Sequence, residues 1–186
     1  MAKQSINIGS SANDGTGSTL REAFDICNDN FTEIYGGTNT AFQFKAEGTN
    51  FTGSLLIGHA TTGTISSAEY NTGVGIGALD ALSTGDNNVA IGHQAGSAIG
   101  GGSQNTLIGK DAGLALTNGN YNIAIGYEAL MTENGHGGNV AVGRRALKAQ
   151  DAGADAYNVA VGFEAGKLVS TGLYNTLIGG QAGDAI

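Results

Sequence analysis

From residue 54 onward, a short apolar run recurs along the chain with a period of 17 residues. Each run begins with Asn and ends with Ile or Val followed by Gly, as in Asn122-Ile123-Ala124-Ile125-Gly126. The Asn and Gly residues pair as Asn71 and Gly75, Asn88 and Gly92, Asn105 and Gly109, Asn122 and Gly126, Asn139 and Gly143, Asn158 and Gly162, and Asn175 and Gly179. The spacing is 17 residues except between Asn139 and Asn158, where it is 19, and a degenerate copy begins at Ser54. A fixed period of this length predicts about eight stacked coils over residues 54–186.

The apolar runs have the composition of short strands. They are too short for a helix and rich in β-branched residues, which favour a pleated backbone. Alternate positions are apolar on both sides, a pattern typical of strands that are buried on both faces. One side is expected to fill the thin interior of the coil, and the other to pack on a neighbouring chain. The pattern therefore predicts a mostly-β protein, a parallel β-solenoid or β-roll.

The recurring small and polar residues are expected to be structural. Gly four residues after Asn suits a corner that needs a positive φ or a close backbone approach, and the Ala three residues later suits a narrow interior. Asn at one place in successive coils can form a ladder of side-chain amides. The remainder of each coil, for example residues 143–148, is compatible with a second strand or with one helical turn.

Residues 1–36 do not follow the repeat. Ile6-Asn7-Ile8-Gly9 alternates like a short strand, and a polar turn rich in Gly, Asn and Asp follows. A capping box at Thr19 and Glu22 then predicts an amphipathic helix that ends at Gly36-Gly37. One helix of this length cannot bury its apolar stripe alone, so it is expected to dock on sister copies or on another protein. The residues predicted to make these contacts are Ile6, Ile8, Leu20, Phe24, Phe31, Ile34 and Tyr35.

These patterns divide the chain into three parts. Residues 1–37 are predicted to be an anchor, residues 38–53 a connector and residues 54–186 the solenoid shaft. The clear copies end at Ile186 without a visible cap, so we expect the shaft to continue or to be covered by another protein.

Composition narrows the possible partners. The chain has 33 Gly and no Pro, with 6% aromatic and 13% charged residues, which excludes collagen and favours a regular repeat of small residues. A net charge of −8 argues against nucleic acid or an anionic membrane as a partner. The single cysteine, Cys27, allows no internal disulfide. Neither a signal peptide nor a membrane span is apparent, so we expect synthesis in the cytoplasm and no membrane insertion.

Candidate chemical sites in the sequence have simpler structural explanations. Residues 73–78 match a dinucleotide-binding G-x-G-x-x-A pattern, but the long helix that should follow is missing. His59 and His93 share one coil position, two strand spacings apart, which is too far for a common metal ion. Arg144 and Arg145 could pair across chains with Glu128 and Glu164 as exposed ion pairs of little energetic weight. We therefore predict no catalytic residues, no metal site and no cofactor.

The amino-terminal segment resembles a known group of viral proteins. Ile6-Asn7-Ile8-Gly9, Asp14-Gly15-Thr16-Gly17, Leu20-Arg21 and residues 28–35 are similar to the amino-terminal segment of baseplate wedge, tail-pin and tail-fibre proteins of tailed bacteriophages. Position 18 departs from that family, with Ser18 where an acidic residue is common. The resemblance covers about 35 residues, and it implies attachment to a phage tail or baseplate and a trimeric assembly.

The repeat carries a second resemblance. Asn122-Ile123-Ala124-Ile125-Gly126 and Asn88-Val89-Ala90-Ile91-Gly92 are similar to the head repeats of trimeric autotransporter adhesins, a parallel β-roll in which three chains pack side by side. Together, the two resemblances imply a virion protein: a homotrimeric phage tail-fibre subunit that serves host adsorption. The alternative is an adhesin or receptor-binding module whose coil surface binds a host glycan. An enzyme such as a polysaccharide depolymerase ranks third, because no pair of carboxylates in a groove is apparent.

Overall fold

The computed structural model describes residues 44–45, 54–57 and 66–184. The predicted anchor, with its strand, its helix and all seven of its predicted contact residues, lies outside these residues. So do His59 and most of the predicted connector. The description below therefore concerns the solenoid.

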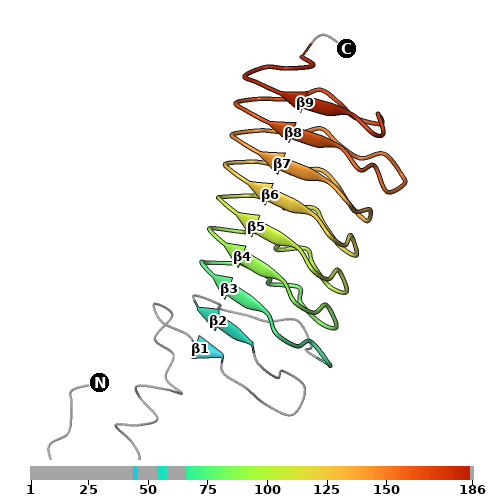
Figure 1. The fold of residues 1–186 in the computed structure, drawn as a ribbon. Helices are drawn as coiled ribbons and strands as arrows, with labels where there is room; N and C mark the ends of the chain where they lie inside the picture. Colours follow the sequence, from blue (N-terminus) through green and yellow to red (C-terminus); the bar gives the residue numbers. More distant parts are fainter. Residues whose placement is uncertain (1–43, 46–53, 58–65, 185–186) are drawn as a thin grey trace, which may run out of the picture. The chain divides into compact units, whose positions relative to one another are not determined.

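The described strands form one nine-stranded sheet in which each strand neighbours the next one along the chain (Figure 1). The first strand, β1, is antiparallel to β2, and all later neighbours are parallel. The strands are β1 (Phe44–Lys45), β2 (Leu55–Ile57), β3 (Thr72–Val74), β4 (Val89–Ile91), β5 (Thr106–Ile108), β6 (Ile123–Ile125), β7 (Val140–Val142), β8 (Val159–Val161) and β9 (Thr176–Ile178). The predicted parallel β-solenoid is confirmed.

The register of the sheet follows the sequence period. Leu55 pairs with Thr72, and Thr72 in turn pairs with Val89, 17 residues later in each case. Between β7 and β8 the offset is 19, with Val140 opposite Val159, so the loop between these strands absorbs the two extra residues. The strands thus stay aligned although one coil is longer.

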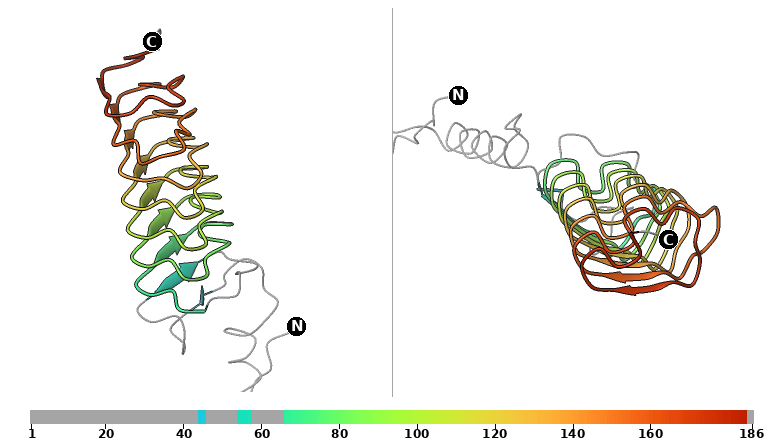
Figure 2. Two further views of the ribbon diagram at one scale, coloured as in Figure 1. Left: turned by 90° about the vertical axis from the view of Figure 1, so that its right-hand side faces the viewer. Right: turned by 90° about the horizontal axis from the view of Figure 1, so that it is seen from above.

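The two sides of each coil lie close together (Figure 2), and small and aliphatic side chains fill the interior between them. The middle residue of each strand from β2 to β8 is buried; Ala90, Leu107 and Ala124, for example, are fully buried. From the opposite side of the coil, Ala78, Leu79 and Leu82 are buried against the same interior. With Ala at so many inward positions, the two sides approach closely and little room remains for larger side chains.

The second half of each coil is neither a strand nor a helix. It is a series of tight turns, in which Ala95 N–H donates to Gly92 O at 3.3 Å and Ile99 N–H donates to Gly96 O at 3.0 Å. Gln94 and Gly96 have φ values of +55° and +56°, and such left-handed residues interrupt both regular structures. Further backbone bonds join consecutive coils on this side, as from Leu79 N–H to Ala95 O at 3.1 Å. The coils are therefore tied together around their whole circumference.

The glycine that follows each strand from β3 to β8 occupies a corner where successive coils nearly touch. Gly126 has a φ of +134°, and a Cβ placed there would lie 2.5 Å from Gly143 O in the next coil. Both the backbone angle and the close approach exclude any larger residue. The same contact recurs along the column, for example between Gly109 and Gly126.

We expect Gly126→Ala to lower the free energy of unfolding by about 3 kcal/mol, since it combines backbone strain with a clash. Gly153→Ala is the matched control, because a Cβ at Gly153 meets nothing within 4 Å and its φ of +69° resembles that of non-glycine residues in this chain. The control should lose about 1 kcal/mol. Urea unfolding followed by circular dichroism measures both, and equal losses would contradict the close-approach explanation.

Candidate functional site

The asparagines at the start of each repeat form a buried column of hydrogen bonds. Asn105 is 1% exposed; its Nδ2 donates to Asn88 Oδ1 at 3.0 Å and to Gly119 O at 2.8 Å. Its Oδ1 accepts from the backbone N–H of Asn122 at 3.0 Å and from Asn122 Nδ2 at 3.2 Å. Each such side chain therefore closes its own coil and also binds the coils before and after it.

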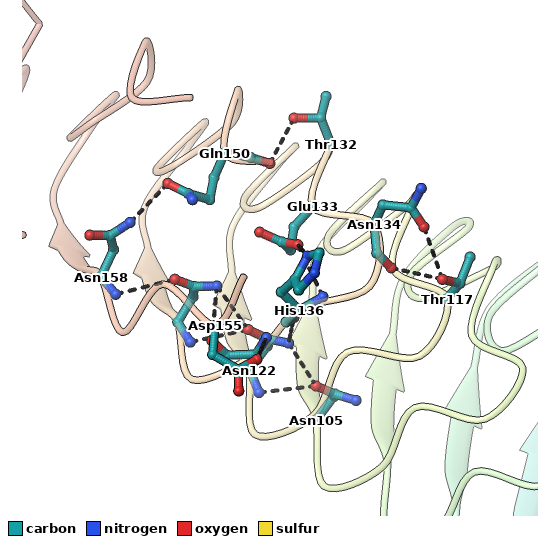
Figure 3. Close-up of polar contacts among 12 residues, drawn as sticks. Asn105, Thr117, Asn122, Thr132, Glu133, Asn134, His136, Gln150, Asp155 and Asn158 are labelled. Carbon is teal, nitrogen blue, oxygen red and sulfur yellow. Dashed lines mark hydrogen bonds and ion pairs between the residues drawn. The ribbon is translucent and has the colours of Figure 1, made fainter. Parts of the chain in front are cut away.

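The column is interrupted at the longer coil, residues 139–157. The backbone N–H of Asn158 still donates to Asn139 Oδ1, at 3.2 Å. Asn158 Nδ2, however, donates to Gln150 Oε1 at 2.9 Å, and Asn139 Nδ2 donates to Gly137 O at 3.4 Å (Figure 3). One side-chain bond between coils is thus replaced at this point by a bond to a different residue.

Removal of one column asparagine should be costly. We expect Asn105→Ala to lower the free energy of unfolding by about 3 kcal/mol, because it leaves buried partners such as Gly119 O without a donor. Asn118→Ala makes the same chemical change at an exposed position of the same coil and should change stability by less than about 0.5 kcal/mol. Thermal and urea unfolding of both variants measure the difference, and similar values would contradict the role assigned to the column.

The outward face of the sheet is a candidate interaction surface on the described part of the chain. In strands β2 to β8 the first and third residues flank a buried middle residue and lie on the outward face. These outward positions hold only Thr, Val, Ile and Leu. Several of these residues are well exposed in the single chain, with Ile91 at 40%, Ile123 at 38% and Ile178 at 71%. An apolar stripe of this kind is typical of an interaction surface.

Beyond the end of the strands, a charged cluster spans consecutive coils. Glu128 binds Arg145 Nε at 2.8 Å and Lys148 Nζ at 2.6 Å. Glu164 binds Arg144 at 2.7 Å and Lys167 at 3.1 Å.

These ion pairs correct the sequence-based expectation. Pairs that we expected to be exposed and to cross between chains form within one chain, and the carboxylates of Glu128 and Glu164 are largely buried. The reason is the period: residues 17 to 20 positions apart lie at the same corner of adjacent coils, about one strand spacing apart.

Aromatic rings extend this cluster. The Tyr127 ring has Lys110 Nζ 5.4 Å and the Arg144 guanidinium carbon 5.9 Å from its centroid, and the same guanidinium carbon lies 5.2 Å from the Phe163 ring. Cations at these distances are attracted to the faces of aromatic rings. The cluster therefore holds coils together along this corner, and its charges are occupied by partners in the same chain.

Glu128 makes the stability of the protein depend on pH. Hydrogen bonds from Lys148, Tyr127 and Arg145 lower the pKa of its carboxyl group to about 2. A lowered pKa in the folded state stabilises the fold above the unfolded-state value of about 4.5 and loses this effect as the pH falls towards 2.

We therefore expect Glu128→Gln to be less stable than the wild type at pH 7, with the two stability curves converging between pH 4.5 and pH 2. Urea unfolding at a series of pH values gives both curves. A gap that stays constant down to pH 2 would show that the effect of the substitution does not come from the carboxylate charge.

Two further candidate sites from the sequence are the dinucleotide-binding pattern at residues 73–78 and the histidine at position 93. Residues 73–78 run from β3 into the corner turn, and no helix follows them in the described chain. His93 Nδ1 lies 3.8 Å from Asp111 Oδ1 at the surface.

One group of residues with potential metal ligands was not predicted from the sequence. Glu133, His136 and Asp151 bring three potential ligand atoms to within 4.8 Å of one another. The sequence does contain an indication of this group. Glu133, a charged residue, occupies the coil position at which other coils have the apolar residues Leu82, Ile99 and Leu116.

A comparison of the chain with protein-family models, with curated proteins and with solved structures gives no match. Within the described ranges, no helix has the length and hydrophobicity that crossing a membrane requires. The interpretation of function therefore depends on the surfaces described above and on the resemblances carried by the sequence.

Proposed function

We propose that this chain is a structural subunit of a phage tail fibre, and that it acts as a homotrimer in the virion. Residues 1–36 attach it to tail or baseplate proteins, and the solenoid projects as a rigid shaft that serves host adsorption. The observation that carries this proposal is the apolar outward face of the sheet, which runs along the whole stack of strands.

The energetics of that face support self-association. Burial of a Val or Ile side chain contributes roughly 1.5–3 kcal/mol when it is complete, and the partly exposed outward residues would each contribute a fraction of this. Summed over eight parallel strands, the gain is comparable to the roughly 4–15 kcal/mol that association costs in lost freedom of motion. The outward positions hold Thr, Val, Ile or Leu in every strand, so a sister copy offers a matching, mostly apolar face along its full length. Closed rotational symmetry is the usual way to cover such a surface.

The internal bonding of the solenoid supports a role as a spacer. Coils are joined by the sheet, by the turn-side backbone bonds and by the asparagine column. Because hydrogen bonds join the coils on both the strand side and the turn side, the solenoid should resist bending. A stiff solenoid suits a shaft that separates a distal tip from the tail. This function requires no catalytic group and no cofactor.

The proposed assembly can be tested by light scattering of the purified full chain. We expect a mass three times the 18.6 kDa of one chain. The double substitution Ile91→Lys and Ile123→Lys, on the outward face of the sheet, should shift the protein to a monomer with an unchanged circular dichroism spectrum. Leu168→Lys is the matched control, since Leu168 is 59% exposed on the turn side, and it should leave the trimer intact.

A wild-type chain that stays monomeric at micromolar concentration would contradict the proposal. That result would favour the alternative function, a receptor-binding module that presents its coil surface to a host glycan. The exposed tyrosines at Tyr121, Tyr157 and Tyr174 are the surface on which such binding would be sought first.

A further inference from the structure

Departures from the repeat are concentrated in two consecutive coils, residues 122–138 and 139–157. The interior column that holds fully buried Leu82, Ile99 and Leu116 holds Glu133 and then Gln150 in these coils, and both are also fully buried. A second column, which is glycine in several coils, holds His136. The two inserted residues occur in the second of these coils. At this level, polar groups have replaced part of the apolar core.

The unusual side chains contact one another. Glu133 Oε1 accepts a hydrogen bond from the His136 backbone N–H at 3.1 Å and lies 3.3 Å from His136 Nδ1 (Figure 3). Asp151, from the following coil, adds a third ligand atom within 4.8 Å of the other two. Among the described residues, Glu133 Oε2 and His136 Nδ1 are buried polar atoms without a hydrogen-bond partner. Such atoms are costly in an interior unless something binds them.

We propose that Glu133, His136 and Asp151 bind a divalent transition-metal ion of the zinc type, which links the two coils. One imidazole nitrogen and two carboxylates form a donor set that Zn²⁺ accepts, with a water molecule as a fourth ligand. Ligands about 2.1 Å from a tetrahedral ion lie about 3.4 Å from each other, which the 3.3 Å between Glu133 Oε1 and His136 Nδ1 matches. Asp151 is exposed, so its side chain can rotate to complete the site.

The electrostatics agree with a missing positive charge. Burial raises the pKa of the Glu133 carboxyl group, and the negative charge of Asp151 raises it further, while the contacts with His136 act in the opposite direction. A buried carboxylate that faces a second carboxylate favours a cation beside it.

The site lies next to the altered part of the asparagine column. At the following boundary between coils, Asn158 Nδ2 donates to Gln150 rather than to Asn139, and Asn139 Nδ2 donates to Gly137 O. A metal ion held between Glu133 and Asp151 would add a link between the coils of residues 122–138 and 139–157, beside the hydrogen bonds from Asn139 to Asn122 that already join them. This inference does not depend on the proposed tail-fibre function.

The full chain, treated with a chelator and dialysed, can be titrated with Zn²⁺ by calorimetry and by competition with a chromogenic chelator. We expect one ion per chain and a higher melting temperature on binding. Glu133→Leu and His136→Gly restore residues that other coils carry at these positions, so both variants should fold, and each should lower the affinity by about 100-fold or more. His93→Ala removes an exposed histidine that also lies beside a carboxylate, and it should leave the affinity unchanged.

The melting temperature of the metal-free Glu133→Leu protein shows whether a loss of Zn²⁺ binding comes from the missing ligand or from a failure to fold. It should melt at a higher temperature than the metal-free wild type, because an apolar residue replaces a buried unpaired carboxyl group. Zn²⁺ binding that survives in both Glu133→Leu and His136→Gly, or that falls equally in His93→Ala, would overturn the proposal. So would the absence of any Zn²⁺ binding by the wild type.

Discussion

The asparagine column is the interaction on which the solenoid depends. Its interior is lined with Ala and short aliphatic residues, so apolar burial per coil is small compared with the entropy lost when 17 residues become ordered. The column offsets this shortfall because one amide both closes a coil and binds two neighbours. From Asn71 to Asn158 its side chains are buried and hydrogen-bonded, which makes the network cooperative and specific for one register.

Stacking imposes a second constraint: every side chain must tolerate its counterpart one coil away. Glycine meets glycine at the corner because nothing larger fits between the backbones. Like charges at one strand spacing repel, so opposite charges at one coil position stabilise the stack. Arg145 follows Glu128 and precedes Glu164 at one position of successive coils, and it contacts both carboxylates. The positions that looked freely variable in sequence are thus coupled between coils.

The strands and their register could be predicted because the period is visible in the sequence and each run is β-branched. The turn side could not be predicted, because its left-handed backbone includes Leu79, Leu130 and Leu147, residues that give no local signal for a positive φ. The prediction that Arg144 and Arg145 form ion pairs with another chain was wrong. The spacing of residues in the sequence does not by itself show that the nearest carboxylate lies in the adjacent coil of the same chain. Glu133 was missed because only the Asn, Gly and Ala columns were compared, whereas its significance lies in the Leu column.

In a repeat protein, residues that recur in every coil and residues that depart from the repeat carry different information. Residues that recur, such as Asn105 and Gly126, specify the architecture and are equivalent from coil to coil. Residues that break a column cost stability locally, as Glu133 and Gln150 do in an apolar interior, so a compensating interaction is expected where they occur. Glu133, His136, Gln150 and the two-residue insertion all lie at one level of the stack. Independent tolerated defects would be scattered along the solenoid, so their coincidence at one level favours a common local cause.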